Sequence, residues 1–181
     1  AHIGLFPPAK NRADVGIDPY KKKQKGNSIM SKKNPNKKSL WAEFKEFINN
    51  DKLSDKERQS DSWMRIGDCY FIQRQYNNAI TSYNNSLKLS DKNADYAYYQ
   101  QAMGYGALGK SNEKIERLNI IITRHQKSSF YERALYEIGT TYLNNNDSRS
   151  AITSFEKISK ERPRSQFARK SLMKIGMIYY N

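Results

Sequence analysis

Hydrophobic residues recur every three or four positions from residue 39 onward, and short polar stretches separate the segments that carry this pattern. Such spacing places apolar side chains on one face of an α-helix. The pattern is clear from Trp63 to Tyr83 and again from Leu135 to Phe155. It predicts an all-α fold of amphipathic helices joined by short turns.

The helical pattern itself repeats along the chain. In each copy a large apolar residue is followed three positions later by an apolar residue or Gln, then directly by a small residue, and then by a tyrosine three positions further on. The four tyrosines are 35, 37 and 37 residues apart and are Tyr70, Tyr105, Tyr142 and Tyr179. A fixed period of this length predicts stacked helix pairs, because one pair cannot bury its apolar face alone.

Each expected pair has a first helix with a small residue and a second helix with an apolar stripe. The small residue should let a neighbouring helix approach closely, and it is Gly67, Ala102, Gly139 or Gly176. The stripes predicted to face the core are Ala79, Tyr83 and Leu87, then Ile115, Leu118 and Ile122, then Ala151, Phe155 and Ile158.

The recurring residues resemble the tetratricopeptide repeat, whose pattern is W-x2-L-G-x2-Y followed by A, F and P. The matching residues are Trp63, Ile66, Gly67, Tyr70, Ala79 and Tyr83 in one unit, and Leu135, Ile138, Gly139, Tyr142, Ala151, Phe155 and Pro163 in another. The resemblance implies a right-handed superhelical solenoid of antiparallel helix pairs.

Units of 37 residues with a P-x-S turn, here Pro163 to Ser165, are similar to a subgroup found in bacterial envelope scaffolds. That subgroup includes the Tol-Pal accessory protein and the lipoprotein of the outer-membrane barrel-assembly machine. The similarity implies a periplasmic or envelope location within a larger assembly, with the cytoplasm as the alternative.

The pattern divides the chain into a basic arm and a repeat array. The predicted array has a partial leading unit over residues 39–58, units over about 59–94, 95–131 and 132–168, and a terminal helix over 169–181. Residues 1–38 contain four prolines and three glycines and show no sustained period, which is typical of extended or disordered segments. This arm is either a solvated tail or a docking segment with residues 3–8 as its apolar anchor.

Charge is concentrated in the arm. The whole chain of 181 residues has 32 Lys and Arg against 18 Asp and Glu, a formal net charge of +14, which favours anionic partners in general. The basic clusters of the arm consist of Lys21, Lys22, Lys23, Lys25, Lys32, Lys33, Lys37 and Lys38. They keep a nucleic-acid or ribosome-associated adaptor open as an alternative function, although Tyr20 is their only aromatic neighbour and base stacking is poorly provided for.

The stretch GYGALGKS, from Gly104 to Ser111, satisfies both the P-loop and the dinucleotide-binding patterns. A phosphate cradle of either kind needs a strand before it, whereas the preceding residues 94–103 have a helical pattern. We therefore interpret the stretch as a helix end and turn, in which Gly109 adopts a left-handed conformation. Gly104 and Gly106 then mark places where something packs closely.

Other catalytic signals are weak. His2 and His125 have no partnering pattern, Cys69 is interpreted as a small buried hydrophobe, and no metal-ligand spacing is present. No apolar run approaches the ~20 residues that span a bilayer. We expect no enzyme activity and no cofactor.

The resemblance assigns the first helix of each unit to a concave surface that binds a protein or peptide. The residues implied there are rich in Tyr and Met, which suit an apolar or amphipathic peptide. They are Met64, Asp68, Phe71, Tyr96, Tyr99, Met103, Arg133, Tyr136, Thr140, Leu143, Lys170, Met173, Met177 and Tyr180. The alternative for each residue is a place in the core or beneath the arm. The expected function is a non-enzymatic protein-interaction scaffold.

Overall fold

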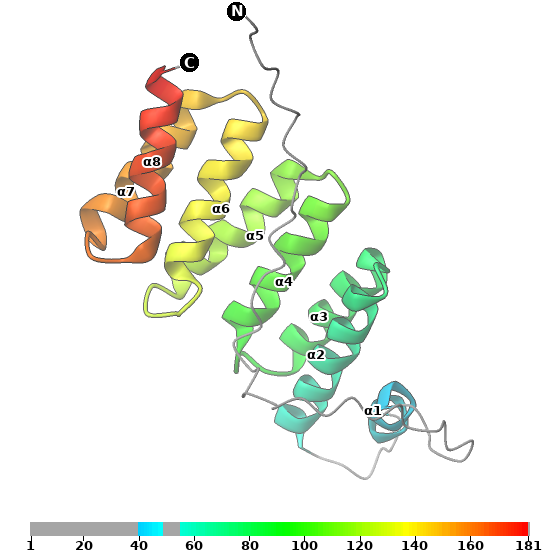
Figure 1. Cartoon of the computed structure of the whole chain (residues 1–181). Coiled ribbons are helices and arrows are strands. Elements are labelled where there is room, and N and C mark those ends of the chain that lie inside the picture. The colour runs from blue at the N-terminus through cyan, green and yellow to red at the C-terminus, as the bar shows by residue number, and fades with distance from the viewer. Residues whose placement is uncertain (1–39, 49–54, 181) are drawn as a thin grey trace, which may run out of the picture. The chain divides into compact units, whose positions relative to one another are not determined.

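A computed structural model describes residues 40–48 and 55–180, and these residues form eight α-helices and no β-strand (Figure 1). The helices are α1 (Leu40–Ile48), α2 (Lys56–Ile72), α3 (Tyr76–Leu89), α4 (Ala94–Ala107), α5 (Ser111–Arg124), α6 (Tyr131–Asn144), α7 (Ser148–Glu161) and α8 (Gln166–Tyr180). The predicted all-α repeat fold is confirmed.

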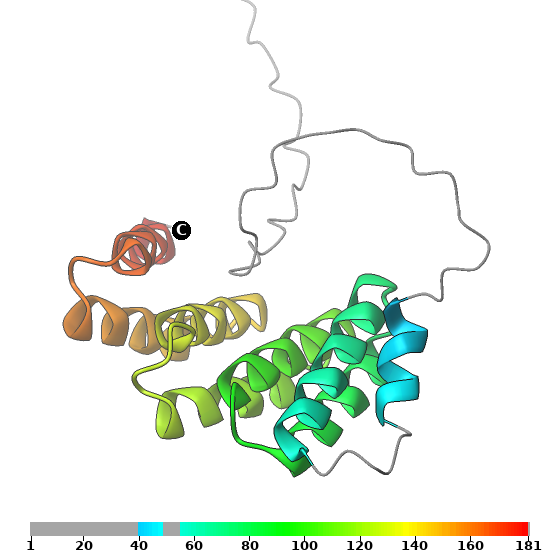
Figure 2. The same ribbon diagram turned by 90° about the horizontal axis from the view of Figure 1, so that it is seen from below.

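The helices follow one another as packed neighbours, from α1 (cyan) at one end to α8 (red) at the other (Figure 2). Three pairs are formed by α2 with α3, α4 with α5, and α6 with α7, and α8 packs on α7. α1 packs on α2 in the place expected for the second helix of a leading unit. None of the described helices is long and apolar enough to cross a membrane.

The turn inside each pair is built in the same way three times. A residue in the left-handed region ends the first helix, with φ of 61° at Arg74, 74° at Gly109 and 62° at Asn146. The next N–H donates to the carbonyl of the recurring tyrosine, from Gln75 to Tyr70, from Lys110 to Tyr105 and from Asp147 to Tyr142, each over 2.9 Å. The sequence period thus corresponds to a repeated hydrogen-bonded turn.

Two of the small residues lie beneath an aromatic ring of the second helix. A Cβ atom added to Gly67 would lie 2.6 Å from Cε1 of Tyr83, and one added to Gly139 would lie 2.6 Å from Cε1 of Phe155. Both rings are completely buried. We call this arrangement a ring-on-glycine contact, and it confirms that these two glycines permit a close helix approach.

The other two small residues differ from this arrangement. Ala102 is completely buried in one cluster with Leu118, which is an aliphatic residue in the place of the ring. A Cβ atom at Gly176 would meet no atom of the described residues within 4 Å. The expectation of a close helix approach stays a prediction at Gly176, because no described second helix follows α8.

The core stripe of α5 is rotated by one residue from the prediction. Ile115, Leu118 and Ile121 are buried, whereas Ile122 is half-buried and packs against both the α4–α5 cluster and the α6–α7 cluster. α5 contacts α4 on one side and α6 on the other. Its apolar stripe is therefore wider than a simple i, i+3, i+7 pattern.

Candidate functional site

The predicted partner-binding residues lie on α2, α4, α6 and α8, the first helices of the repeat, and we call their common side the first-helix face. Met64 of α2 and Tyr99 of α4 are not on its surface, since only 5% and 8% of these residues are exposed. Each packs in a core cluster with neighbouring first and second helices. Their assignment as contact residues is corrected to a core role. The repeat pattern does not determine the rotation of each helix about its axis, and the observed rotation turns these two side chains into the core.

Asp68 joins two helix pairs instead of standing open on the face. Its Oδ1 accepts hydrogen bonds from the hydroxyl of Tyr83 on α3 over 2.8 Å and from the hydroxyl of Tyr96 on α4 over 2.7 Å. Gln100 Nε2 donates in turn to the Tyr96 hydroxyl over 3.0 Å. Burial, and after it the charge of Asp68, raises the pKa of Tyr83. This network holds α2, α3 and α4 in register and leaves one side of it on the first-helix face.

Two cations lie over one aromatic ring between α6 and α8. The guanidinium carbon of Arg133 is 6.0 Å from the ring centroid of Phe167, and Lys170 Nζ is 5.7 Å from the same centroid. Arg133 also lies 5.8 Å from the ring centroid of Tyr99. Contacts of this kind hold a cation in place while its remaining donors stay available. Among the described residues, no carboxylate forms an ion pair with Arg133 or Lys170.

Tyr136 completes this aromatic cluster on α6. Its ring centroid is 5.5 Å from that of Phe155 and 5.7 Å from that of Phe167. Thr140 is half-buried, and its hydroxyl donates to the Tyr136 carbonyl over 2.9 Å. The hydroxyl hydrogen of Thr140 is therefore used in a hydrogen bond within α6. We call the group of Arg133, Tyr136, Phe167 and Lys170 the cation–aromatic cluster.

The remaining predicted residues of α2, α4 and α6 are half-buried. Phe71 packs edge-on against Tyr76, with ring centroids 5.3 Å apart, and Met103 packs against the α4–α5 cluster. Tyr96 lies between the rings of Tyr83 and Phe130. Only part of each of these side chains is exposed, so they pack beneath the first-helix face and do not project from it.

Predicted residues at the end of the described array are open. Met173, Met177 and Tyr180 of α8 are 70%, 55% and 91% exposed, and Leu143 of α6 is half-buried. The lysines predicted to form basic clusters at residues 21–38 lie outside the described residues. Among the predicted residues, the exposed ones therefore lie on α8, and those of α6 are half-buried.

Two aromatic residues at this face were missed by the sequence analysis. Phe130 precedes α6 and stacks on Tyr99 at 5.0 Å between ring centroids, and Phe167 begins α8. They are 37 residues apart, which is the repeat length. The signal that would have found them is this recurrence at the start of a first helix, outside the pattern used to define the repeat.

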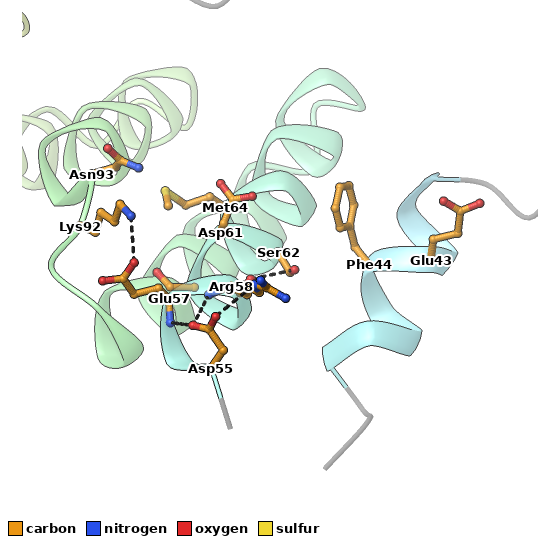
Figure 3. Close-up of a pocket in the computed structure, with 11 residues that line it drawn as sticks. Glu43, Phe44, Asp55, Glu57, Arg58, Asp61, Ser62, Met64, Lys92 and Asn93 are labelled. Atoms are coloured by element: carbon orange, nitrogen blue, oxygen red, sulfur yellow. Dashed lines mark hydrogen bonds and ion pairs between the residues drawn. The ribbon is translucent and has the colours of Figure 1, made fainter. Parts of the chain in front are cut away.

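A cavity of about 610 Å³ lies between α1, the start of α2 and the turn before α4 (Figure 3). Asp55 caps α2 by accepting from the N–H groups of Glu57 and Arg58, over 3.1 Å and 3.2 Å. Glu57 pairs with Lys92 at 2.8 Å, and Phe44 of α1 lines the same cavity. The carboxylates of Asp55 and Glu57 are used for the cap and the ion pair, and we assign this cavity no ligand.

The stretch from Gly104 to Ser111 is a helix end and turn, as interpreted from the sequence. The N–H groups of Leu108, Gly109 and Lys110 donate to backbone carbonyls of α4, over 3.1, 3.1 and 2.9 Å. Gly104 lies against the side chain of Ile80, and Gly106 lies against the aliphatic part of Lys114. The amides that a phosphate would need are therefore already bonded.

The side chains of His125, Cys69 and Tyr99 pack against neighbouring residues of the fold. His125 follows α5 and lies 6.1 Å from the ring of Tyr98. Cys69 is half-buried, and burial together with Asp68 raises the pKa of its thiol. Burial, and next the charge of Glu137, raises the pKa of Tyr99 to about 12. Over the described ranges, no group of three or more His, Cys, Asp or Glu residues could hold a metal ion.

Comparisons with known proteins agree with this architecture. Two family models, both described as tetratricopeptide repeat, match residues 60–93 and 133–165. The chain therefore contains tetratricopeptide repeats, which are generally non-enzymatic protein-interaction modules, and no catalytic family is indicated. No match was found among curated protein sequences.

Solved structures with low sequence identity share the fold. The crystal structure of MamA is 20% identical, with 76% of this chain and 73% of that chain covered and a TM-score of 0.59. The first TPR domain of Spaghetti (RPAP3) bound to the HSP90 peptide SRMEEVD is 19% identical, with 69% and 96% covered and a TM-score of 0.55. The N-terminal domain of stress-induced protein-1 from C. elegans is 16% identical, with 67% and 98% covered and a TM-score of 0.57.

Proposed function

We propose that this chain is a protein-interaction module that binds a peptide segment of a partner protein on its first-helix face. The observation that carries the proposal is the cation–aromatic cluster between α6 and α8. It combines two cations, each without a carboxylate partner in the described part of the chain, with aromatic rings that offer apolar contact. A segment that carries acidic and apolar residues side by side matches both properties.

A similar fold in another protein supports peptide binding as the mode of action. The Spaghetti domain is bound to a peptide that contains two glutamates and a terminal aspartate. At 19% identity this likeness concerns the fold, so the partner chemistry of the present chain rests on Arg133, Lys170 and their aromatic neighbours.

The proposed setting is a larger assembly in a bacterial envelope. Its support is the similarity of the 37-residue units and of the turn at Pro163 to envelope scaffolds. Fractionation of cells that produce the full-length protein tests this setting. Recovery with the cytoplasmic fraction would favour the cytoplasmic alternative.

A display selection of random peptides on the full chain tests the binding function. We expect enrichment of peptides in which acidic residues neighbour an apolar one, and Arg133→Ala should weaken their binding about tenfold, the loss of one charge-assisted contact. The matched control is Arg162→Ala, since Arg162 also lies over a ring, 6.0 Å from that of Tyr131, but at the end of α7. No enrichment, or an equal effect of both substitutions, would contradict the proposal.

A salt series separates the nucleic-acid alternative from peptide binding. Binding of single-stranded or duplex DNA through the basic arm should fall steeply with salt, because each neutralised phosphate releases counterions. Peptide binding should fall less steeply, since salt screens only the contacts of Arg133 and Lys170 with acidic residues and leaves the apolar contact with Phe167 unchanged.

A further inference from the structure

The middle helix pair carries a lysine where the two other pairs have a buried alanine. Lys114 is the fourth residue of α5, and the fourth residues of α3 and α7 are Ala79 and Ala151, both completely buried. The Lys114 side chain is 14% exposed. A charged group at such a position is costly unless it has a partner. The exchange therefore needs both space and an opposite charge.

Gly106 provides the space for this lysine. It is the penultimate residue of α4, where α2 has Phe71 and α6 has Leu143. A Cβ atom at Gly106 would lie 3.0 Å from Cδ of Lys114, so the aliphatic chain of the lysine covers the position of the missing side chain. The large and the small residue of the repeat have thus changed places between the two helices of this pair.

Glu137 provides the opposite charge. Lys114 Nζ lies 2.8 Å from Oε2 of Glu137 on α6, whose side chain is 27% exposed, so the ion pair joins the middle unit to the next one. Glu137 follows Arg133 by four residues, and side chains at this spacing are neighbours on a helix surface. Arg133 is therefore the adjacent cation to which the carboxylate of Glu137 would turn if Lys114 were absent.

Glu137 and Arg133 also lie close to the same phenol. Burial is the main cause that raises the pKa of Tyr99, the charge of Glu137 raises it further, and the charge and hydrogen bonding of Arg133 lower it. Glu137 is nevertheless paired with Lys114, whereas Arg133 lies over the rings of Tyr99 and Phe167. Within residues 40–48 and 55–180, Arg133 has no carboxylate partner.

We propose that Lys114 is a positioning residue for the peptide-binding site, because by holding Glu137 it keeps the guanidinium of Arg133 available to an acidic residue of the partner. This role rests on the proposed function of the cation–aromatic cluster. Lys114 itself does not contact the partner. The determinants of acidic specificity thus extend from the first-helix face to the second helix α5.

Fluorescence anisotropy of two labelled octapeptides with the full chain tests this role. One peptide alternates glutamate with leucine and the other alternates glutamine with leucine, so the difference between their affinities reports the charge-assisted contacts. Lys114→Met keeps a long apolar side chain at this position but frees Glu137 to pair with Arg133. The variant should bind the glutamate peptide about tenfold more weakly than the wild-type protein does. Its affinity for the glutamine peptide should be unchanged.

A double variant separates the positioning role from charge and packing. Lys114→Met with Glu137→Gln leaves no carboxylate to compete for Arg133, so binding of the glutamate peptide should return to within about twofold of wild type. The matched control is Lys110→Met, which removes the same charge from an exposed residue at the start of α5 and should bind nearly as the wild-type protein does. Equal weakening by Lys114→Met and Lys110→Met, or no recovery in the double variant, overturns the proposal.

A measurement without peptide distinguishes failure of this role from failure of the binding function. The Nε–H nuclear magnetic resonance signal of Arg133, assigned by its loss in Arg133→Ala, should shift in Lys114→Met and return towards its wild-type position in the double variant. Urea unfolding of the same variants establishes that each is folded. If the wild-type protein does not prefer the glutamate peptide, the proposed function fails, and the Arg133 signal still decides whether Lys114 holds Glu137 away from Arg133. A signal that does not respond to Lys114→Met overturns the positioning role.

Discussion

The outer helix pairs and the middle pair fill the same position with different partners. In α2–α3 and α6–α7 a glycine lies under the buried ring of Tyr83 or Phe155, whereas α4–α5 has Ala102 with Leu118. The glycine and the ring belong together, because a Cβ atom would overlap the ring. The middle pair departs from the repeat pattern at both positions at once, and its smaller aliphatic residue leaves room for the alanine. The sizes of the two residues in this contact are thus matched: glycine lies under a ring, and alanine lies under leucine.

The largest effect should come from breaking the match in the third unit. Gly139→Ala adds a methyl group 2.6 Å from the completely buried ring of Phe155. Overpacking of this kind outweighs the better helix propensity of alanine and should lower the free energy of unfolding by about 2 kcal/mol. Urea unfolding measures the change.

The matched control for this substitution is Gly106→Ala. Its added Cβ would meet only the flexible Lys114 side chain at 3.0 Å, and Gly106 is exposed. The free energy of unfolding should therefore change little. A loss as large as that of Gly139→Ala would show that the helix, and not the ring, is sensitive to the methyl group.

A second prediction places the alanine and leucine of the middle pair at positions 139 and 155 of the third unit. Phe155→Leu alone leaves a cavity over Gly139, and Gly139→Ala alone overpacks the ring, so the double variant should lose less stability than the sum of the single variants. The coupling free energy should be at least about 1 kcal/mol. Additive losses in the double-mutant cycle would mean that the residues at positions 139 and 155 do not interact energetically.

A third prediction concerns the ring that the middle pair places against the next unit. Tyr99 stacks on Phe130, and its pKa is raised to about 12 by burial and Glu137. The folded state therefore holds the phenol proton more tightly than the unfolded chain, whose value is near 10. Its stabilising contribution is complete below pH 10 and is lost as the pH rises from 10 to 12, by at most about 1.4 kcal/mol per pH unit.

Tyr99→Phe should flatten this alkaline loss, as measured by urea unfolding over the same pH range. Tyr180→Phe removes a hydroxyl from a residue that is 91% exposed, and the profile should keep its slope. An identical slope for the wild-type protein and Tyr99→Phe would show that the buried phenol does not couple ionisation to folding.

Sequence spacing was sufficient for the repeat and for its turns. Tyr70, Tyr105 and Tyr142 recur because their carbonyls accept the same turn hydrogen bond, and such local bonds leave a fixed spacing. The spacing also separated the turn at Gly109 from a phosphate cradle, because the residues before it had a helical pattern.

The rotation of each helix could not be predicted in the same way. Met64 and Tyr99 are core residues, and Ile121 replaces Ile122 at the centre of the α5 stripe, because each helix packs against two neighbours at once. Phe130 directly precedes α6 and Phe167 is the second residue of α8, so both lie before the part of the helix that defines the repeat pattern. The cation–aromatic cluster depends on contacts between units, which no single repeat encodes.

The central claim is that a repeat glycine is required where a buried ring lies on it, as at Gly139, and not where no described atom lies over it, as at Gly176. Urea unfolding of Gly139→Ala and Gly176→Ala side by side tests it most directly. Alanine at Gly139 should destabilise the protein, whereas alanine at Gly176 should leave it unchanged or stabilise α8 by up to about 1 kcal/mol, since alanine is the better helix former. A comparable loss of stability in both variants would contradict the account.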